Sequence, residues 1–245
     1  MRLKSVVKYY LSDIKTSVMI FYIIMAVGVS MIGIIVNVSA GEGDSYSGGG
    51  EMAAMIFLFI AGLNSFKQNF LFLSLNSIPR KLQFKGFLLA ALTVCGAMAA
   101  IDTAYSNIFS LFFDYRSTFL QIYGSWAAAT SGAVVILVTF LWDITIYLSA
   151  YIGGYLITSL YYRMSKLTKI VVSIGVPAWF TIVLPIIDAT VTEGRIFKYI
   201  GNAILIFGGL KYGVNPYIPV LSLTVEAAVA AILCFMLVKT ATVKE

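Results

Sequence analysis

Six long apolar runs constrain what this chain can fold into more than any other feature of its sequence. A transmembrane helix needs about 20 mostly apolar residues, and each run reaches that length. A membrane segment must satisfy its own backbone hydrogen bonds, and the runs lack the alternation of barrel strands, so helices are expected. The predicted spans cover residues 17–38, 52–74, 86–112, 132–161, 170–189 and 217–238. The sequence therefore predicts an all-α integral membrane protein with six transmembrane helices, in which residues 1–245 form a single transmembrane domain.

The composition argues against a water-soluble globule and against several kinds of active site. Only 11% of the 245 residues are charged, whereas a soluble domain carries roughly 25%. The chain has no histidine and no phosphate-binding loop of the Walker A type. No nucleophile stands in a recognisable pattern with a base, and no metal-ligand pattern is visible. We therefore expect this chain to have no catalytic residues, no metal site and no cofactor of its own.

The basic residues predict how the chain is oriented in the membrane. With the amino terminus in the cytoplasm, four of the 17 Lys and Arg residues fall in outer segments, namely Arg116, Arg195, Lys198 and Lys211. Cytoplasmic loops carry an excess of Lys and Arg, so this arrangement is expected. The chain is thus predicted to be a multi-pass protein of the cytoplasmic membrane with both termini in the cytoplasm. The formal charge of +6 follows from the same asymmetry and requires no nucleic acid partner.

Two segments outside the spans have helical character. Residues 1–14 carry apolar side chains near helical spacing with charged residues mostly elsewhere, which is typical of an amphipathic helix in the inner interface. Residues 196–210 are apolar, but they are short and are interrupted by Lys198 and Asn202. We therefore expect an outer re-entrant or interfacial hairpin over residues 192–216 in place of a seventh span.

A basic segment separates the second and third apolar runs. Its sequence is NSIPRKLQFKGF, residues 76–87, and a proline at the start of a helix is favourable because that position needs no backbone N–H. The segment predicts a short cytoplasmic helix over 78–85 before the third span starts at Gly86. Cations are interspersed with apolar side chains along it, and both kinds suit a protein partner. These residues are Ile78, Arg80, Lys81, Leu82, Phe84 and Lys85. The alternative is a positively charged loop that only sets the orientation of the chain.

This layout resembles the permease subunits of ATP-binding-cassette (ABC) transporters of the exporter type, also called type V or type 2. The local sequence similarity to this family lies in residues 62–89, GLNSFKQNFLFLSLNSIPRKLQFKGFLL. The resemblance implies that the 78–85 segment is a coupling helix that docks on a separate ABC ATPase subunit, which holds ATP and magnesium. It also implies a second permease subunit, identical or homologous. The substrate would be hydrophobic or amphipathic, such as a peptide, a lipid or a drug, exported through the lipid membrane.

Three carboxylates lie within predicted spans, at Asp102, Asp143 and Glu226. A charged side chain at the centre of a bilayer costs at least ~2.5 kcal/mol unless it is sheltered. Asp143 heads a stripe with Tyr147 and Tyr151, spaced four residues apart on one helix face. These residues could line a polar translocation pathway for an amphipathic or cationic substrate. Alternatively, the acids could accept interhelical hydrogen bonds that lock the bundle together.

Two other functional classes stay open. The intramembrane carboxylates could serve a proton- or cation-coupled secondary transporter, although no internal repeat of the kind common in such proteins is visible. The chain could also be a non-transporting membrane component, such as an immunity or assembly factor. In each case Pro177 and Pro185 are expected to kink or break the fifth span.

Overall fold

The computed structural model describes residues 2–39, 46–47, 49–111 and 115–241, and it is almost entirely helical. The prediction of six transmembrane helices is confirmed by length and composition within these residues. The elements are α1 (Arg2–Ser39), α2 (Gly50–Ser65), α3 (Lys67–Leu75), α4 (Arg80–Phe109), α5 (Thr118–Ala128), α6 (Gly132–Arg163), α7 (Lys166–Ala178), the π-helical turn η1 (Trp179–Val183), α8 (Leu184–Thr190), α9 (Arg195–Phe207) and α10 (Tyr217–Thr240). A short parallel pair joins β1 (Tyr46–Ser47) to β2 (Tyr115–Arg116).

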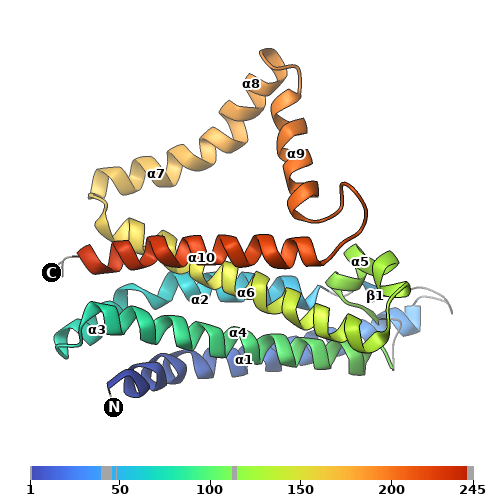
Figure 1. Cartoon of the computed structure of the whole chain (residues 1–245), viewed down its shortest axis with the longest axis horizontal. Helices are drawn as coiled ribbons and strands as arrows, with labels where there is room; N and C mark the ends of the chain where they lie inside the picture. Colours follow the sequence, from blue (N-terminus) through green and yellow to red (C-terminus); the bar gives the residue numbers. More distant parts are fainter. Residues whose placement is uncertain (1, 40–45, 48, 112–114, 242–245) are drawn as a thin grey trace.

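Helix α6 is the centre of the bundle. It packs against α2, α10 and α4, while α1 lies along α4, and the axes of these helices are roughly aligned (Figure 1). Its closest neighbour is α2, because Gly62 and Gly154 bring the two backbones together. A Cβ atom at Gly62 would overlap the carbonyl oxygen of Tyr151, and one at Gly154 would overlap that of Phe59. Small residues of this kind allow close helix packing in membranes, where lipid removes the hydrophobic drive for association.

The two ends of the bundle differ in what they carry. Both chain termini and the α3–α4 turn lie at one end, which we call the terminal end (Figure 1). Helix α5 and the β1–β2 pair lie at the other end, which we call the α5 end. That both termini lie on the same side of a membrane stays a prediction, with which their position at one end of the bundle is consistent. That this side is the cytoplasm stays a prediction from the distribution of lysine and arginine.

The first helix differs from the sequence-based expectation. The predicted separation of an interfacial helix over residues 1–14 from a first span over 17–38 is not seen, because α1 runs unbroken from Arg2 to Ser39. No glycine or proline occurs between residues 11 and 27, and Val6, Tyr10 and Ile14 form one buried face in the core that α1 shares with α4. At 1.5 Å per residue, a helix of 38 residues is about 57 Å long, which exceeds the roughly 30 Å hydrocarbon core. One part of α1 must therefore lie outside that core, and the interfacial position of residues 1–14 stays a prediction.

The basic segment after the second span is also corrected. The chain does turn at residues 76–79, but α4 then continues from Arg80 to Phe109, so a separate helix over 78–85 is wrong. Gln83 donates from Nε2 to the Ile78 carbonyl (2.8 Å) and to Ser74 Oγ (3.2 Å), which fastens the turn to the first turns of α4. Phe84 and Phe87 continue one buried face across Gly86, so nothing interrupts the helix there.

The fifth span leaves the bundle. No side chain of α7 or η1 is buried, and Figure 1 shows this segment rising away from α6 and α10. The segment containing the two prolines stays helical from Lys166 to Thr190, and the π-helical turn that lies between them widens the helix. Of the two expected outcomes, a kink or a break, the break into short pieces does not occur.

The segment predicted as a hairpin, 192–216, contains α9 and the loop that leads to α10. Asp188 at the end of α8 accepts hydrogen bonds from the backbone N–H groups of Ile196 (2.8 Å) and Phe197 (3.3 Å). It thereby caps the amino terminus of α9, where such donors have no partner within the helix. That the segment re-enters the membrane or lies at its surface stays a prediction.

Candidate functional site

The turn between α3 and α4 forms an exposed surface at the terminal end. The name α3–α4 tip is used below for four exposed residues in and beside this turn, which are Leu75, Pro79, Lys81 and Lys85. The Leu75 side chain is 81% exposed, and the two lysines make no hydrogen bond or ion pair within the described residues. An exposed apolar side chain beside free cations is a combination that suits a protein partner.

Only part of the predicted ATPase-binding set lies on this tip. Lys81 and Lys85 are exposed there, whereas Phe84 is buried in ring contact with Phe87 and Phe235. The other two apolar residues, Ile78 and Leu82, are half-buried against the same core. Phe84 therefore belongs to the core of this chain, whereas Ile78 and Leu82 keep part of their surface exposed. That these residues bind an ATPase subunit stays a prediction. Leu75 was missed, although an apolar residue directly before the polar pair Asn76–Ser77 was a visible signal.

Arg80 has a structural partner in this chain. Its Nη1 donates to the Lys239 carbonyl at 3.0 Å, and Arg163 Nη2 donates to the Thr240 carbonyl at 3.2 Å and to Thr240 Oγ1 at 2.8 Å. The last carbonyls of a helix have no partner within it and carry partial negative charge. The two arginines therefore cap α10 and tie its end to α4 and α6.

The intramembrane acids accept hydrogen bonds between helices. Tyr147 on α6 donates to Asp102 Oδ2 on α4 at 2.5 Å, and Thr103 on α4 donates to Asp143 Oδ2 on α6 at 3.2 Å. Glu226 on α10 accepts from Ser149 on α6. The structure therefore brings Asp102, Asp143 and Tyr147 together between α4 and α6. Glu226 lies at a separate contact of α6 with α10.

Tyr151 has a different role from Tyr147 in the predicted stripe. Its hydroxyl group lies 3.0 Å from Ser65 Oγ on α2, and its side chain is buried in the main core. The stripe thus connects α6 to two different helices.

Sequence reasoning missed another buried acid, Glu51, which lies just before the predicted second span at 52–74. Glu51 lies in the first turn of α2 and is 3% exposed. Its Oε2 accepts from Thr118 N (3.2 Å) and Thr118 Oγ1 (2.8 Å), and its Oε1 lies 3.5 Å from Ser106 Oγ. An acidic residue is favourable in a first helical turn, where the helix dipole is positive, and this position was the available signal. Glu51 joins the starts of α2 and α5.

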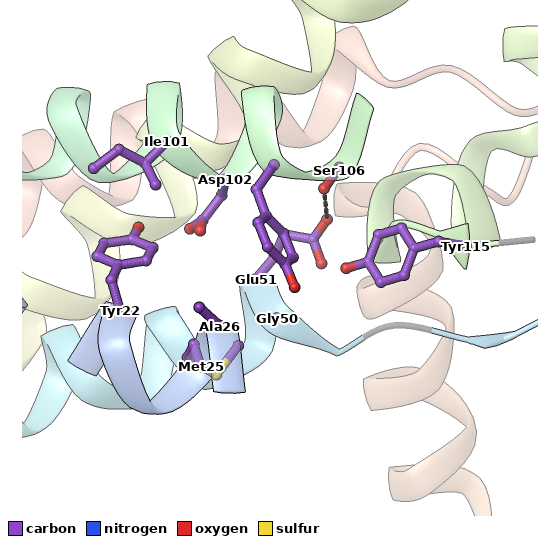
Figure 2. Close-up of a pocket in the computed structure, with 10 residues that line it drawn as sticks. Tyr22, Met25, Ala26, Gly50, Glu51, Ile101, Asp102, Ser106 and Tyr115 are labelled. Atoms are coloured by element: carbon purple, nitrogen blue, oxygen red, sulfur yellow. Dashed lines mark hydrogen bonds between the residues drawn. The ribbon is translucent and has the colours of Figure 1, made fainter. Parts of the chain in front are cut away.

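A cavity of about 190 Å³ opens beside these acids, toward the α5 end. Figure 2 shows the carboxylates of Asp102 and Glu51 in this space, with Tyr22 and Tyr115 at its two sides. The complete lining consists of Tyr22, Met25, Ala26, Gly50, Glu51, Ile101, Asp102, Tyr105, Ser106 and Tyr115. Helices α1, α2 and α4, together with β2, therefore present two acids and three tyrosines to one small cavity.

The Tyr147–Asp102 hydrogen bond predicts a measurable coupling. Tyr147 is fully buried, so Tyr147→Phe is expected to lower the free energy of unfolding by about 2 kcal/mol, the scale of a hydrogen bond to a charged group. In an Asp102→Asn background the same substitution should cost less, because the acceptor is neutral. Thermal unfolding of the single and double variants in detergent measures this coupling. Tyr161→Phe is the matched control, because its hydroxyl group makes an exposed contact with Ser173. Equal costs of Tyr147→Phe in both backgrounds would contradict the coupling.

Comparisons with protein-family models, with curated proteins and with solved structures give no match for this sequence. A function is therefore argued from the residues and contacts of this chain.

Proposed function

We propose that this chain is the permease subunit of an ATP-driven ABC exporter, powered by separate ATPase subunits. The observation that supports this function best is the continuity of α4. The helix begins at the α3–α4 tip and carries Asp102 of the cavity about 30 Å further on, at 1.5 Å per residue. A partner that moved the tip would therefore move one wall of the cavity through a single helix, without a hinge between them.

The contacts of α4 suggest how such a movement would spread. Arg80 links the start of α4 to the end of α10, and Tyr147 and Thr103 link its far half to α6. A displacement of α4 would change its contacts with α6 and α1 and so the shape of the cavity. Helices respond as rigid elements over this distance, which makes them suitable for coupling an ATPase to a membrane site. The expected cargo is a hydrophobic or amphipathic peptide, lipid or drug.

The fifth span supports a second permease subunit in the complex. Helix α7 and η1 bury no side chain in this chain and expose large apolar residues, including Ile174, Trp179 and Phe180. Lipid can cover such a surface, and so can another subunit. We propose that an identical or homologous permease packs there.

The test of the proposal is to change the α3–α4 tip. Leu75→Glu combined with Lys81→Glu should reduce the ATPase activity that co-purifies with the tagged chain from its native membrane by about tenfold or more, because both an apolar anchor and a cation are lost. Leu111→Glu with Lys211→Glu is a matched control, since it makes the same changes at exposed positions away from the tip. ATPase activity that is equal in both double variants would count against the proposed docking surface.

One observation favours a second candidate, a proton- or cation-coupled secondary transporter. Asp143 is fully buried, and its Oδ1 has no hydrogen-bond partner within the described residues. A buried carboxylate that lacks a partner for one oxygen is suited to carry a proton. Transport driven by a pH gradient in liposomes that contain this chain alone would favour the second candidate over the first.

A further inference from the structure

We infer that the cavity lined by Asp102 and Glu51 is a binding site for a small organic cation that carries an ammonium group. Such binding does not depend on whether an ATPase or an ion gradient drives the protein.

Acids without a basic partner, in and behind the cavity, favour a cationic ligand. Asp102 and Glu51 line the cavity, and Asp143 accepts a hydrogen bond from Thr103, the neighbour of Asp102. None of these three acids forms an ion pair with Lys or Arg within the described residues. Arg116 follows Tyr115 directly, but it is exposed and does not line the cavity. Acids buried in a membrane protein require a compensating partner, and a bound cation would supply it.

The unpartnered oxygen of Asp143 is a second, independent observation. The Asp143 side chain has no exposed surface, and Oδ1 accepts no hydrogen bond from any described residue. A buried polar atom without a partner costs free energy and calls for an explanation. A cation bound in the cavity would stabilise the ionised form of Asp143 from a distance, even without touching it.

The spacing of the acids favours an organic cation over a metal ion. Metal ions need several oxygen ligands at about 2.0–2.6 Å. No group of three acidic, histidine or cysteine side chains within the described residues lies close enough to hold a metal ion. An ammonium group carries its charge over a larger volume, so it can interact with carboxylates that are further apart.

The remaining walls suit the alkyl part of such a ligand. Tyr22, Tyr105 and Tyr115 contribute aromatic rings, and Met25, Ala26 and Ile101 are apolar. The Tyr22 hydroxyl group donates to the Met98 carbonyl at 3.1 Å, which helps to hold this ring in place. The ring lies at one side of the cavity (Figure 2). Aromatic rings next to a carboxylate bind ammonium groups through cation–π attraction, which strengthens where water is excluded.

The test measures binding of choline, a small quaternary ammonium probe, to the full purified chain in lipid nanodiscs. Saturable binding of radiolabelled choline is expected. Its neutral isostere dimethylbutanol, in which carbon replaces the nitrogen, should fail to compete, because the site selects charge. No saturable binding of choline, or equal competition by the isostere, overturns the inference.

Two variants test where the ligand binds, and a third variant serves as a control. Asp102→Asn removes a cavity charge, and Ala26→Phe fills the cavity without changing charge; each should weaken choline binding by about tenfold or more. Glu226→Gln removes an intramembrane acid outside the cavity and should bind as the unmodified chain does. Size-exclusion profiles verify that each variant is folded. If Asp102→Asn does not fold, the binding affinity of Ala26→Phe decides the result. Unchanged affinity in either folded cavity variant overturns the inference.

Discussion

Replacing Gly154 with valine should strongly destabilise the protein, because the new side chain would collide with the backbone of α2. A Cβ atom at this position overlaps the Phe59 carbonyl oxygen and lies 2.9 Å from Leu63 N, both on α2. These atoms belong to a helix backbone, so no side-chain rotation can relieve the overlap. Helices α2 and α6 form the most extensive pair in the bundle and would have to separate. The expected loss is about 3 kcal/mol, at the upper end of overpacking costs.

The neighbouring glycine provides the control for this prediction. Gly153→Val makes the same change one residue earlier in α6, where a Cβ atom meets nothing within 4 Å. The cost in helix propensity is the same for both variants, so the difference between them isolates the contact. The thermal midpoint of Gly154→Val in detergent should lie about 10 °C below that of Gly153→Val. Similar midpoints would show that α2 and α6 do not pack at these glycines.

Replacing Glu51 with alanine should have a comparably large effect, about 3 kcal/mol, because it leaves the buried Thr118 N–H and hydroxyl groups without their acceptor. The start of α5 is then held to the bundle by fewer contacts. Glu51→Gln should cost less, since its amide oxygen still accepts from Thr118. The measurement is the thermal midpoint of each variant in detergent.

The control for Glu51 is an exposed acid. Glu193→Ala removes a carboxylate that is exposed in the turn before α9, and it should change the midpoint little. A Thr118→Val substitution should add little to Glu51→Ala, because the two residues form one contact. If Glu51→Ala and Glu193→Ala unfold at the same temperature, Glu51 does not join α2 to α5.

Two of the three acids at the candidate site were predictable from the sequence, but the geometry of the site was not. Asp102 and Asp143 were identified because charge is rare and costly within apolar runs. Glu51 escaped notice because it follows a polar, glycine-rich stretch, and only its contact with Thr118, distant in sequence, shows that it is buried. The burial of one residue of the predicted partner surface escaped notice for a similar reason. Phe84 has the composition of a docking residue, but its contact with Phe235 on α10 makes it part of the core.

The helices themselves were predictable, because lipid offers no hydrogen bonds and each apolar run must therefore satisfy its own backbone. Where the helices continue or pair was decided only by tertiary structure. Val6 packs at Gly86, where a Cβ atom would lie 3.1 Å from the Val6 Cβ, and α1 and α4 both run on without the breaks expected at residues 14–17 and 85–86. Contacts between residues far apart in the chain set these features, and local sequence patterns carry no record of them.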